Sequence, residues 1–201
     1  MTQNSSLHYH LNWAKERIDE MDAGVASLEA KAGDVQADLR DKAKHALADL
    51  SEKRDAFKGL VKKQEGANEA AWNSTEAQME TDWTRYEVDM RKYVESFGDQ
   101  AKQQQATFKL QADAQLKAWR AAADHFQAAG THFATERRAE IDATVARMKE
   151  EATVAAAKLQ KLQGAGAESW TVLMAGLTET RAALDHAYHA AREAFKKANA
   201  D

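Results

Sequence analysis

The sequence predicts an all-α protein built from long antiparallel helices. The chain has 201 residues, among them 43 alanines and nine glycines, and it has neither proline nor cysteine. Apolar or small residues recur at alternating steps of three and four along most of it, which is the spacing of a coiled-coil seam. Proline is about 5 % of average usage and commonly marks turns, so its absence argues against a β-sandwich or an α/β enzyme, which need many connections.

The first predicted helix runs from Leu11 to the glycine at position 66. Its seam alternates steps of three and four, except for consecutive fours from Leu39 to Leu47, a stutter that locally unwinds a supercoil. The seam consists of Leu11, Ala14, Ile18, Met21, Val25, Leu28, Ala32, Val35, Leu39, Ala43, Leu47, Leu50, Phe57 and Val61.

A shorter helix follows and ends near residue 97. Gly66 can end the first helix, and Asn68 can cap the next one with its side-chain oxygen. The seam of this shorter helix is aromatic and methionine-rich: Trp72, Met79, Trp83, Tyr86, Met90, Tyr93 and Phe97.

The second part of the chain repeats this pattern at a shift of 98 residues. The shift superimposes Gly66 on Gly164 and Trp72 on Trp170 without a gap. We therefore expect a tandem duplication. Its parts are a flexible N-terminus (1–7), a helical hairpin repeat (8–98) and a second helical hairpin repeat (99–201), which together form one structural unit.

The expected architecture is a pair of elongated antiparallel hairpins that form a coiled-coil-like four-helix bundle with long two-helix arms. The chain would reverse at Gly66, at Gly98 with Asp99 as the following N-cap, and at Gly164.

Two other arrangements stay open. Residues 68–163 could form one nearly continuous rod with a weak break at Gly98. Alternatively, breaks at Gly33 and Gly130 would give six shorter helices. The seam passes both glycines without a change of phase, so we favour continuity there, with a local cost of about 1 kcal/mol per glycine.

The sequence contains no recognisable catalytic arrangement. A chain without cysteine has no thiol nucleophile and no Cys-based zinc site. It also has no nucleophile elbow, no phosphate-binding glycine loop and no His-Glu-x-x-His motif. Carboxylates alternate with lysine and arginine, as around Asp38 and Arg40, which is typical of a solvated helix face. We expect no enzyme, no catalytic residue and no cofactor.

His186 and His189 are the best candidates for metal ligands. They lie three residues apart on one predicted helix, with Asp185 four residues before the second histidine. Both histidines flank the seam residue Tyr188. Ordinary positions beside a helix seam therefore explain them better than a metal-binding role does. We expect no metal, and the sequence leaves the question open.

Basic residues gather at two places near helix ends. Cations there complement the helix dipole and need no nucleic-acid partner to explain them. Residues 1–98 hold 14 basic and 19 acidic residues, and residues 99–201 hold 14 and 13, so neither half is a basic module and no nucleic acid is expected. The basic residues are Lys53, Arg54, Lys58, Lys62 and Lys63, and then Arg192, Lys196 and Lys197.

Tyr9 and Trp13 are the aromatic residues that fall off the seam. They lie four residues apart on a ridge away from Ala14 and Ile18, so the sequence predicts that they are exposed or that they pack against another chain. A homodimer is the expected oligomer.

Several segments resemble small bacterial coiled-coil proteins that are labelled stress-response or apolipoprotein-like. The second repeat departs from the pattern, because it has an arginine where the second tryptophan is expected. The segments are residues 28–32 (LEAKA), residues 51–56 (SEKRDA), Gly66, Ala71, Trp72, Trp83 and Phe97, with Trp170 and Arg181 in the second repeat. The resemblance implies a soluble, stress-associated helical protein that binds or protects and has no reaction or cofactor.

These observations predict a non-enzymatic helical interaction or structural protein that is stress-associated and self-associating, with an unidentified protein partner. The alternative is a reversible amphipathic binder of lipid or polymer-granule surfaces, like apolipoproteins or phasins. The start of the chain resembles no secretory signal and no apolar run reaches about 18 residues, so the cytoplasm is the default location.

Overall fold

The computed structural model describes residues 3–64, 66–97, 100–133, 135–164 and 170–200, and in these ranges it is helical with no strand. The all-α prediction is therefore confirmed. The elements are α1 (Gln3–Lys31), the 3₁₀ turn η1 (Ala32–Asp34), α2 (Arg40–Gln64), α3 (Glu69–Phe97), α4 (Gln100–Gly130), α5 (Thr135–Gly164) and α6 (Trp170–Ala200). The first of these helices begins inside the stretch 1–7 for which we expected a flexible terminus.

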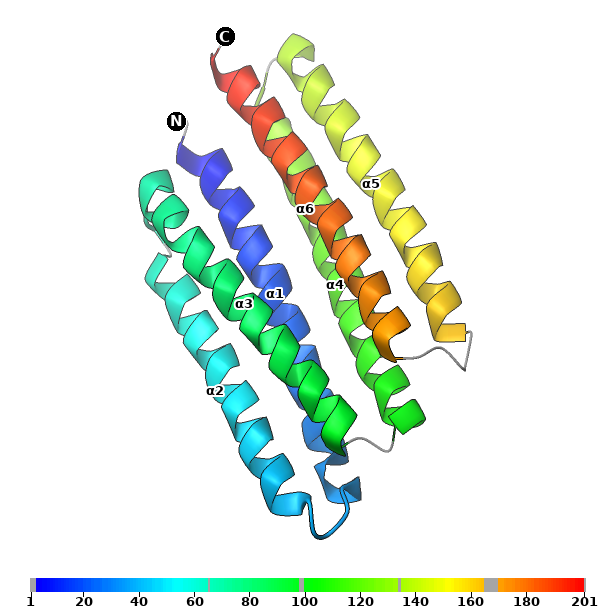
Figure 1. Ribbon diagram of the computed structural model, residues 1–201. Coiled ribbons are helices and arrows are strands. Elements are labelled where there is room, and N and C mark those ends of the chain that lie inside the picture. The colour runs from blue at the N-terminus through cyan, green and yellow to red at the C-terminus, as the bar shows by residue number, and fades with distance from the viewer. Residues whose placement is uncertain (1–2, 65, 98–99, 134, 165–169, 201) are drawn as a thin grey trace.

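The six helices run along one common direction and alternate in sense along the chain (Figure 1). The helices α1 and α4 lie in the middle and make the most extensive contact of any pair. The helix α2 packs on α1 and α3, while α5 packs on α4 and α6. The molecule thus consists of a first half (α1–α3) and a second half (α4–α6) that meet along α1 and α4.

The predicted continuous long helices are wrong, and so are the two-helix arms and the rod over 68–163. The chain leaves the first helix in η1, and Val35 after it is extended, with φ −67° and ψ 137°. Folding back at this point buries Val35 (3 % exposed) and lays α2 against α1, so the seam keeps its phase although the helix does not continue. The structure has the six shorter helices that we considered the weaker arrangement.

A second break follows α4 at Gly130. A Cβ atom at this glycine would lie 2.8 Å from Cγ2 of Ile141, so the absence of a side chain allows α5 to approach closely. The chain also does not run on from α3 into α4, because the two helices point in opposite directions (Figure 1).

The predicted turn after α2 is confirmed. Gly66 has φ +82°, a left-handed conformation that glycine adopts without a steric penalty. Oδ1 of Asn68 accepts a hydrogen bond from the backbone N–H of Ala71 at 3.0 Å, which is the expected N-cap. Gly164 is the last residue of α5. The reversal predicted at Gly98 and Asp99 lies outside the described residues.

Trp13 is buried within the chain. The prediction that it is exposed or packs against another chain is therefore wrong. Its side chain is 4 % exposed, and its ring centroid lies 6.4 Å from that of Phe57 on α2. The reason is that α1 contacts α2, α3, α4 and α6, so the face away from its seam is covered as well. The side chain of Tyr9 lies outside the described part of the structure.

The two halves have different cores. The larger apolar cluster fills the first half and reaches into α4, α5 and α6 with Phe108, Leu159 and Leu177. In the second cluster, around Trp119 and Phe126, half of the buried residues are alanine. Each methylene buried contributes about 0.8 kcal/mol, so alanines hold α5 in place with less apolar contact than larger side chains would give.

Two helical glycines should respond in opposite ways to alanine. A Cβ at Gly24 would lie 2.8 Å from Oη of Tyr86 and 3.0 Å from Sδ of Met90, whereas nothing lies within 4 Å of one at Gly59. We expect Gly59→Ala to raise the free energy of unfolding by about 0.5–1 kcal/mol and Gly24→Ala to lower it by about 1–3 kcal/mol. Urea unfolding of both variants measures this, and a Gly24→Ala protein as stable as Gly59→Ala would contradict the close packing of α1.

Candidate functional site

A cluster of charged side chains lies in the middle of the bundle, where the two halves meet. We call it the charge network. Glu16 and Glu20 share one face of α1 because residues four apart on a helix are neighbours, and the same spacing joins the two α6 members. The network consists of Glu16, Arg17 and Glu20 on α1, Glu87 on α3, and Arg181 and Asp185 on α6.

Arg181 is the cation that ties α6 to the first half. Its side chain is 5 % exposed, and its Nη2 and Nε donate to the two carboxylate oxygens of Glu20 at 2.5 and 3.2 Å. Its Nη1 donates to Oε1 of Glu87 at 2.7 Å. The guanidinium also lies over the ring of Trp83, 4.6 Å from the centroid. Two carboxylates and one aromatic face thus surround this buried cation.

Arg17 makes the opposite connection, from α1 to the second half. Its Nη2 donates to Oδ2 of Asp185 at 2.8 Å, and its Nη1 contacts the carboxyl group of Glu16. Its guanidinium lies 4.4 Å from the ring centroid of Trp13. Each half therefore places one arginine against a carboxylate of the other half.

Polar side chains of α4 and α6 complete the network. Nε2 of Gln115 donates to Oε1 of Glu20 at 3.2 Å and to the carbonyl of Leu177 at 3.1 Å. The Thr180 hydroxyl donates to Oε1 of Gln115. A further buried polar contact joins α1 and α4, where Oγ of Ser27 and Oγ1 of Thr107 are 2.9 Å apart. Polar contacts therefore join α1 and α4 at two places, beside buried apolar residues such as Phe108.

The pKa values of the two buried carboxyl groups of α1 are shifted in opposite directions. Burial raises the pKa of Glu16 well above its ordinary value, and the adjacent Glu20 raises it further, although Arg17 acts against this. The pKa of Glu20 is lowered, because the charge of Arg181 and the hydrogen bond with Glu16 outweigh the effect of burial. The pKa of Glu16 is thus shifted toward the protonated form, whereas the pKa of Glu20 is shifted toward the carboxylate.

The two arginines stay charged in spite of their burial. Burial alone lowers the pKa of Arg17, but Glu16 and Asp185 more than compensate, and Glu20 and Glu87 do the same for Arg181. Glu87 and Asp185 have exposed side-chain fractions of 19 % and 30 %, so the network reaches solvent at its two carboxylate ends.

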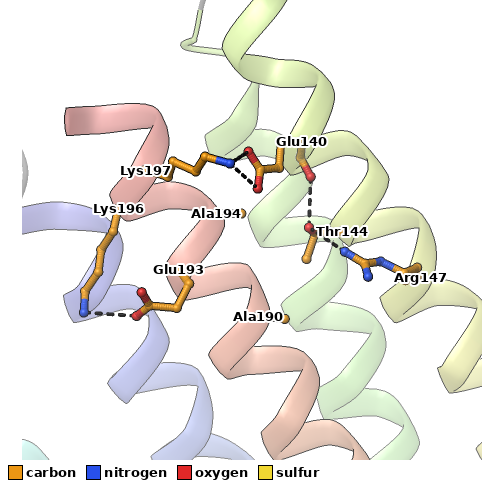
Figure 2. A pocket seen from close by; sticks show the side chains of 8 residues that line it. All are labelled: Glu140, Thr144, Arg147, Ala190, Glu193, Ala194, Lys196 and Lys197. Carbon is orange, nitrogen blue, oxygen red and sulfur yellow. Dashed lines mark hydrogen bonds and ion pairs between the residues drawn. The ribbon is translucent and has the colours of Figure 1, made fainter. Parts of the chain in front are cut away.

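The hollows on the surface differ from the network, because they are open to solvent. Figure 2 shows one of about 410 Å³ between α5 and α6, over Ala190 and Ala194. Its charged rim is paired: Lys197 lies 3.0 Å from Glu140, and Lys196 lies 3.1 Å from Glu193. Both lysines of this rim are thus neutralised by neighbouring glutamates.

The residues that the sequence suggested as ligands are not brought together. His186 and His189 are exposed, and Asp185, their possible companion, binds Arg17. Among the described residues, no three His, Asp or Glu side chains are placed to hold a metal ion together. In the basic cluster before Gly66, Lys53 binds Asp89 and Lys58 binds Asp22, each at 2.7 Å.

Sequence reasoning missed the charge network. The sequence did contain one signal for it, since Arg181 stands 98 residues after Trp83, where the resemblance leads one to expect a tryptophan. An arginine at a seam position of a helix needs a buried carboxylate, and this could have directed attention to Glu16 and Glu20.

The chain matches no protein-family model, no curated protein and no solved structure. No described helix carries an apolar stretch long enough to cross a membrane.

Replacing Glu16 by glutamine should make the protein less sensitive to rising pH. A carboxyl whose pKa is raised by folding stabilises the folded state below its ordinary pKa of 4.5, and this stabilisation is lost as the pH rises through the folded-state pKa. Glutamine keeps a donor toward Glu20 without a titrating proton. We therefore expect the unfolding free energy of Glu16→Gln, relative to the wild type, to increase as the pH is raised from 4.5.

Urea unfolding between pH 4.5 and 8 measures the effect. The matched control is Glu29→Gln, at an exposed position of the same helix, whose difference from the wild type should stay constant with pH. Parallel pH profiles for Glu16→Gln and the wild type would show that Glu16 does not hold the proton.

Proposed function

We propose that this chain is a non-enzymatic helical interaction or structural protein that associates with itself. One observation carries the proposal: in the described residues, the buried charged groups are neutralised by one another across the contact between the halves. A catalytic carboxyl pair needs access to substrate, whereas Glu16 and Glu20 are fully buried and engaged with Arg17 and Arg181. A protective or scaffolding role under stress is what the sequence resemblance adds to this proposal.

We also propose that the two halves are copies of one another. The helices α1–α3 and α4–α6 follow in the same order, with breaks after Lys31 and Gly130. Two residues 98 positions apart, Trp83 and Arg181, lie against each other in the centre. Glu87 and Asp185, which are also 98 positions apart, each bind the arginine of the other half. These reciprocal contacts support a duplication with approximate two-fold symmetry.

Sedimentation equilibrium of the purified chain tests self-association. We expect the average mass to rise from one chain toward two as the concentration increases into the tens of micromolar, because association follows mass action. A strictly monomeric chain over this range would remove the main support for a self-associating protein.

A second candidate function, reversible binding to lipid or polymer-granule surfaces, is favoured by the core of the second half. Half of the buried residues there are alanine, so separating α5 from α4 and α6 exposes less apolar surface to water than opening a leucine-rich core would. The helix released in this way could place its apolar face on a surface.

Vesicle flotation distinguishes this candidate from the first. A surface-binding protein floats with vesicles of anionic or zwitterionic lipid, and we expect more of it to float with anionic vesicles if lysine and arginine side chains contribute. Absence of the protein from the floated fraction with both lipids would discard the candidate and leave the interaction protein in place.

A further inference from the structure

We infer that two copies of this protein can exchange halves, so that the first half of each copy packs against the second half of the other through the charge network. This inference rests on the proposed self-association and names its partner surface. In the exchanged pair, the face that each half buries against the rest of its own chain is covered instead by a second copy of the chain.

The two halves carry complementary charges where they meet. The first half presents Glu20 and Glu87 to Arg181, at 2.5 and 2.7 Å, and the second half presents Asp185 to Arg17 at 2.8 Å. A charge that is buried without its partner is strongly unfavourable. A separated half that buries this face again therefore needs a surface that supplies the complementary charges in the same places.

Two identical halves do not reproduce these pairs. Two first halves would bring Glu16 and Glu20 of both together without Arg181. Two second halves would bring two copies of Arg181 together, while Ala114 and Ala118 occupy the positions 98 residues after Glu16 and Glu20. Only a first half and a second half place each arginine against the carboxylates that it binds in this structure, which is discrimination by unfavourable alternatives.

The two halves are joined by one connection along the chain. The contact between α1 and α4 is the most extensive in the molecule, and it forms between segments on either side of a single connection, the one from Phe97 to Gln100. When two chains exchange halves, every contact across α1, α3, α4 and α6 is made again, twice, and the pair closes with two-fold symmetry. No new interface is required.

Two charge-reversed chains test the exchange. Arg17→Asp places two carboxylates opposite each other, and Asp185→Arg places two guanidiniums opposite each other, in the monomer and in any dimer of one variant. In an exchanged dimer of one chain of each variant, one of the two interfaces contains both substitutions, whose opposite charges attract each other. The other interface contains neither substitution. Each variant is unfolded in urea and refolded either alone or together with the other.

We expect the mixture to contain a species of twice the mass of one chain, in at least a several-fold larger share than either variant refolded alone, by size-exclusion chromatography with light scattering. Lys53→Asp and Asp89→Lys provide the matched control. This pair is 2.7 Å apart but lies entirely within the first half, so mixing these two variants should produce no gain. A mixture of the network variants that behaves as the sum of its parts would overturn the inference.

A disulfide version covers the case in which the charge-reversed chains fail to fold. The chain has no cysteine of its own, and Ser27 and Thr107 face each other across α1 and α4 with their oxygens 2.9 Å apart. We expect chains carrying Ser27→Cys alone and Thr107→Cys alone, one of them isotopically labelled, to form an interchain bond between positions 27 and 107 after joint refolding and oxidation. The Ser27→Cys, Thr107→Cys double variant supplies the in-chain bond as the positive control. An in-chain bond in the double variant with no interchain bond in the mixture would overturn the inference.

The outcome also separates this inference from the proposed function. If the wild type dimerises but neither mixture shows exchange, the dimer uses another surface, and the inference fails while the function stands. If the wild type stays monomeric and neither mixture shows exchange, both fail.

Discussion

The removal of two arginines from water is the constraint on which the rest of this structure depends. A buried guanidinium is tolerated only where carboxylates lie within hydrogen-bond distance, and Arg181 and Arg17 take theirs from helices far away in the sequence. The positions of α1, α3 and α6 relative to one another are therefore fixed by charge as well as by apolar packing. Replacing such a network by apolar side chains can stabilise a protein, so burial of the network is not by itself a source of stability.

The charge network holds more carboxyl groups than guanidiniums. Arg17 and Arg181 face the carboxyl groups of Glu16, Glu20, Glu87 and Asp185. Burial raises the pKa of Glu16, which opposes a further negative charge in the interior. Glu87 and Asp185 lie nearest the surface, where contact with solvent lowers the cost of their charge.

The sequence predicts the helical class and the turn at Gly66 because both depend on local chemistry. Spacing of apolar residues indicates helices, and glycine followed by an asparagine cap indicates where one helix ends and the next begins. The break at residues 32–39 could not be predicted in the same way. Val35 keeps the phase of the seam whether the helix continues or the chain folds back, and only packing against α2 decides between them.

The candidate site was hidden for a related reason. Charged residues next to a seam are usually solvated, as Asp38 and Asp41 are. Glu16 and Arg17 are buried instead, because α1 is covered on more than one side and a single seam cannot describe its buried surface. The same fact explains why Trp13, off the seam, is buried.

The alternation of the six helices has an electrostatic consequence. Three helix N-termini and three C-termini point toward each end of the bundle (Figure 1), so the macrodipoles of α1, α3 and α5 oppose those of α2, α4 and α6. The opposed macrodipoles therefore largely cancel along the axis of the bundle. Whatever potential an approaching molecule meets at the two ends is set by side chains, such as Lys62 and Lys63 in the last turn of α2.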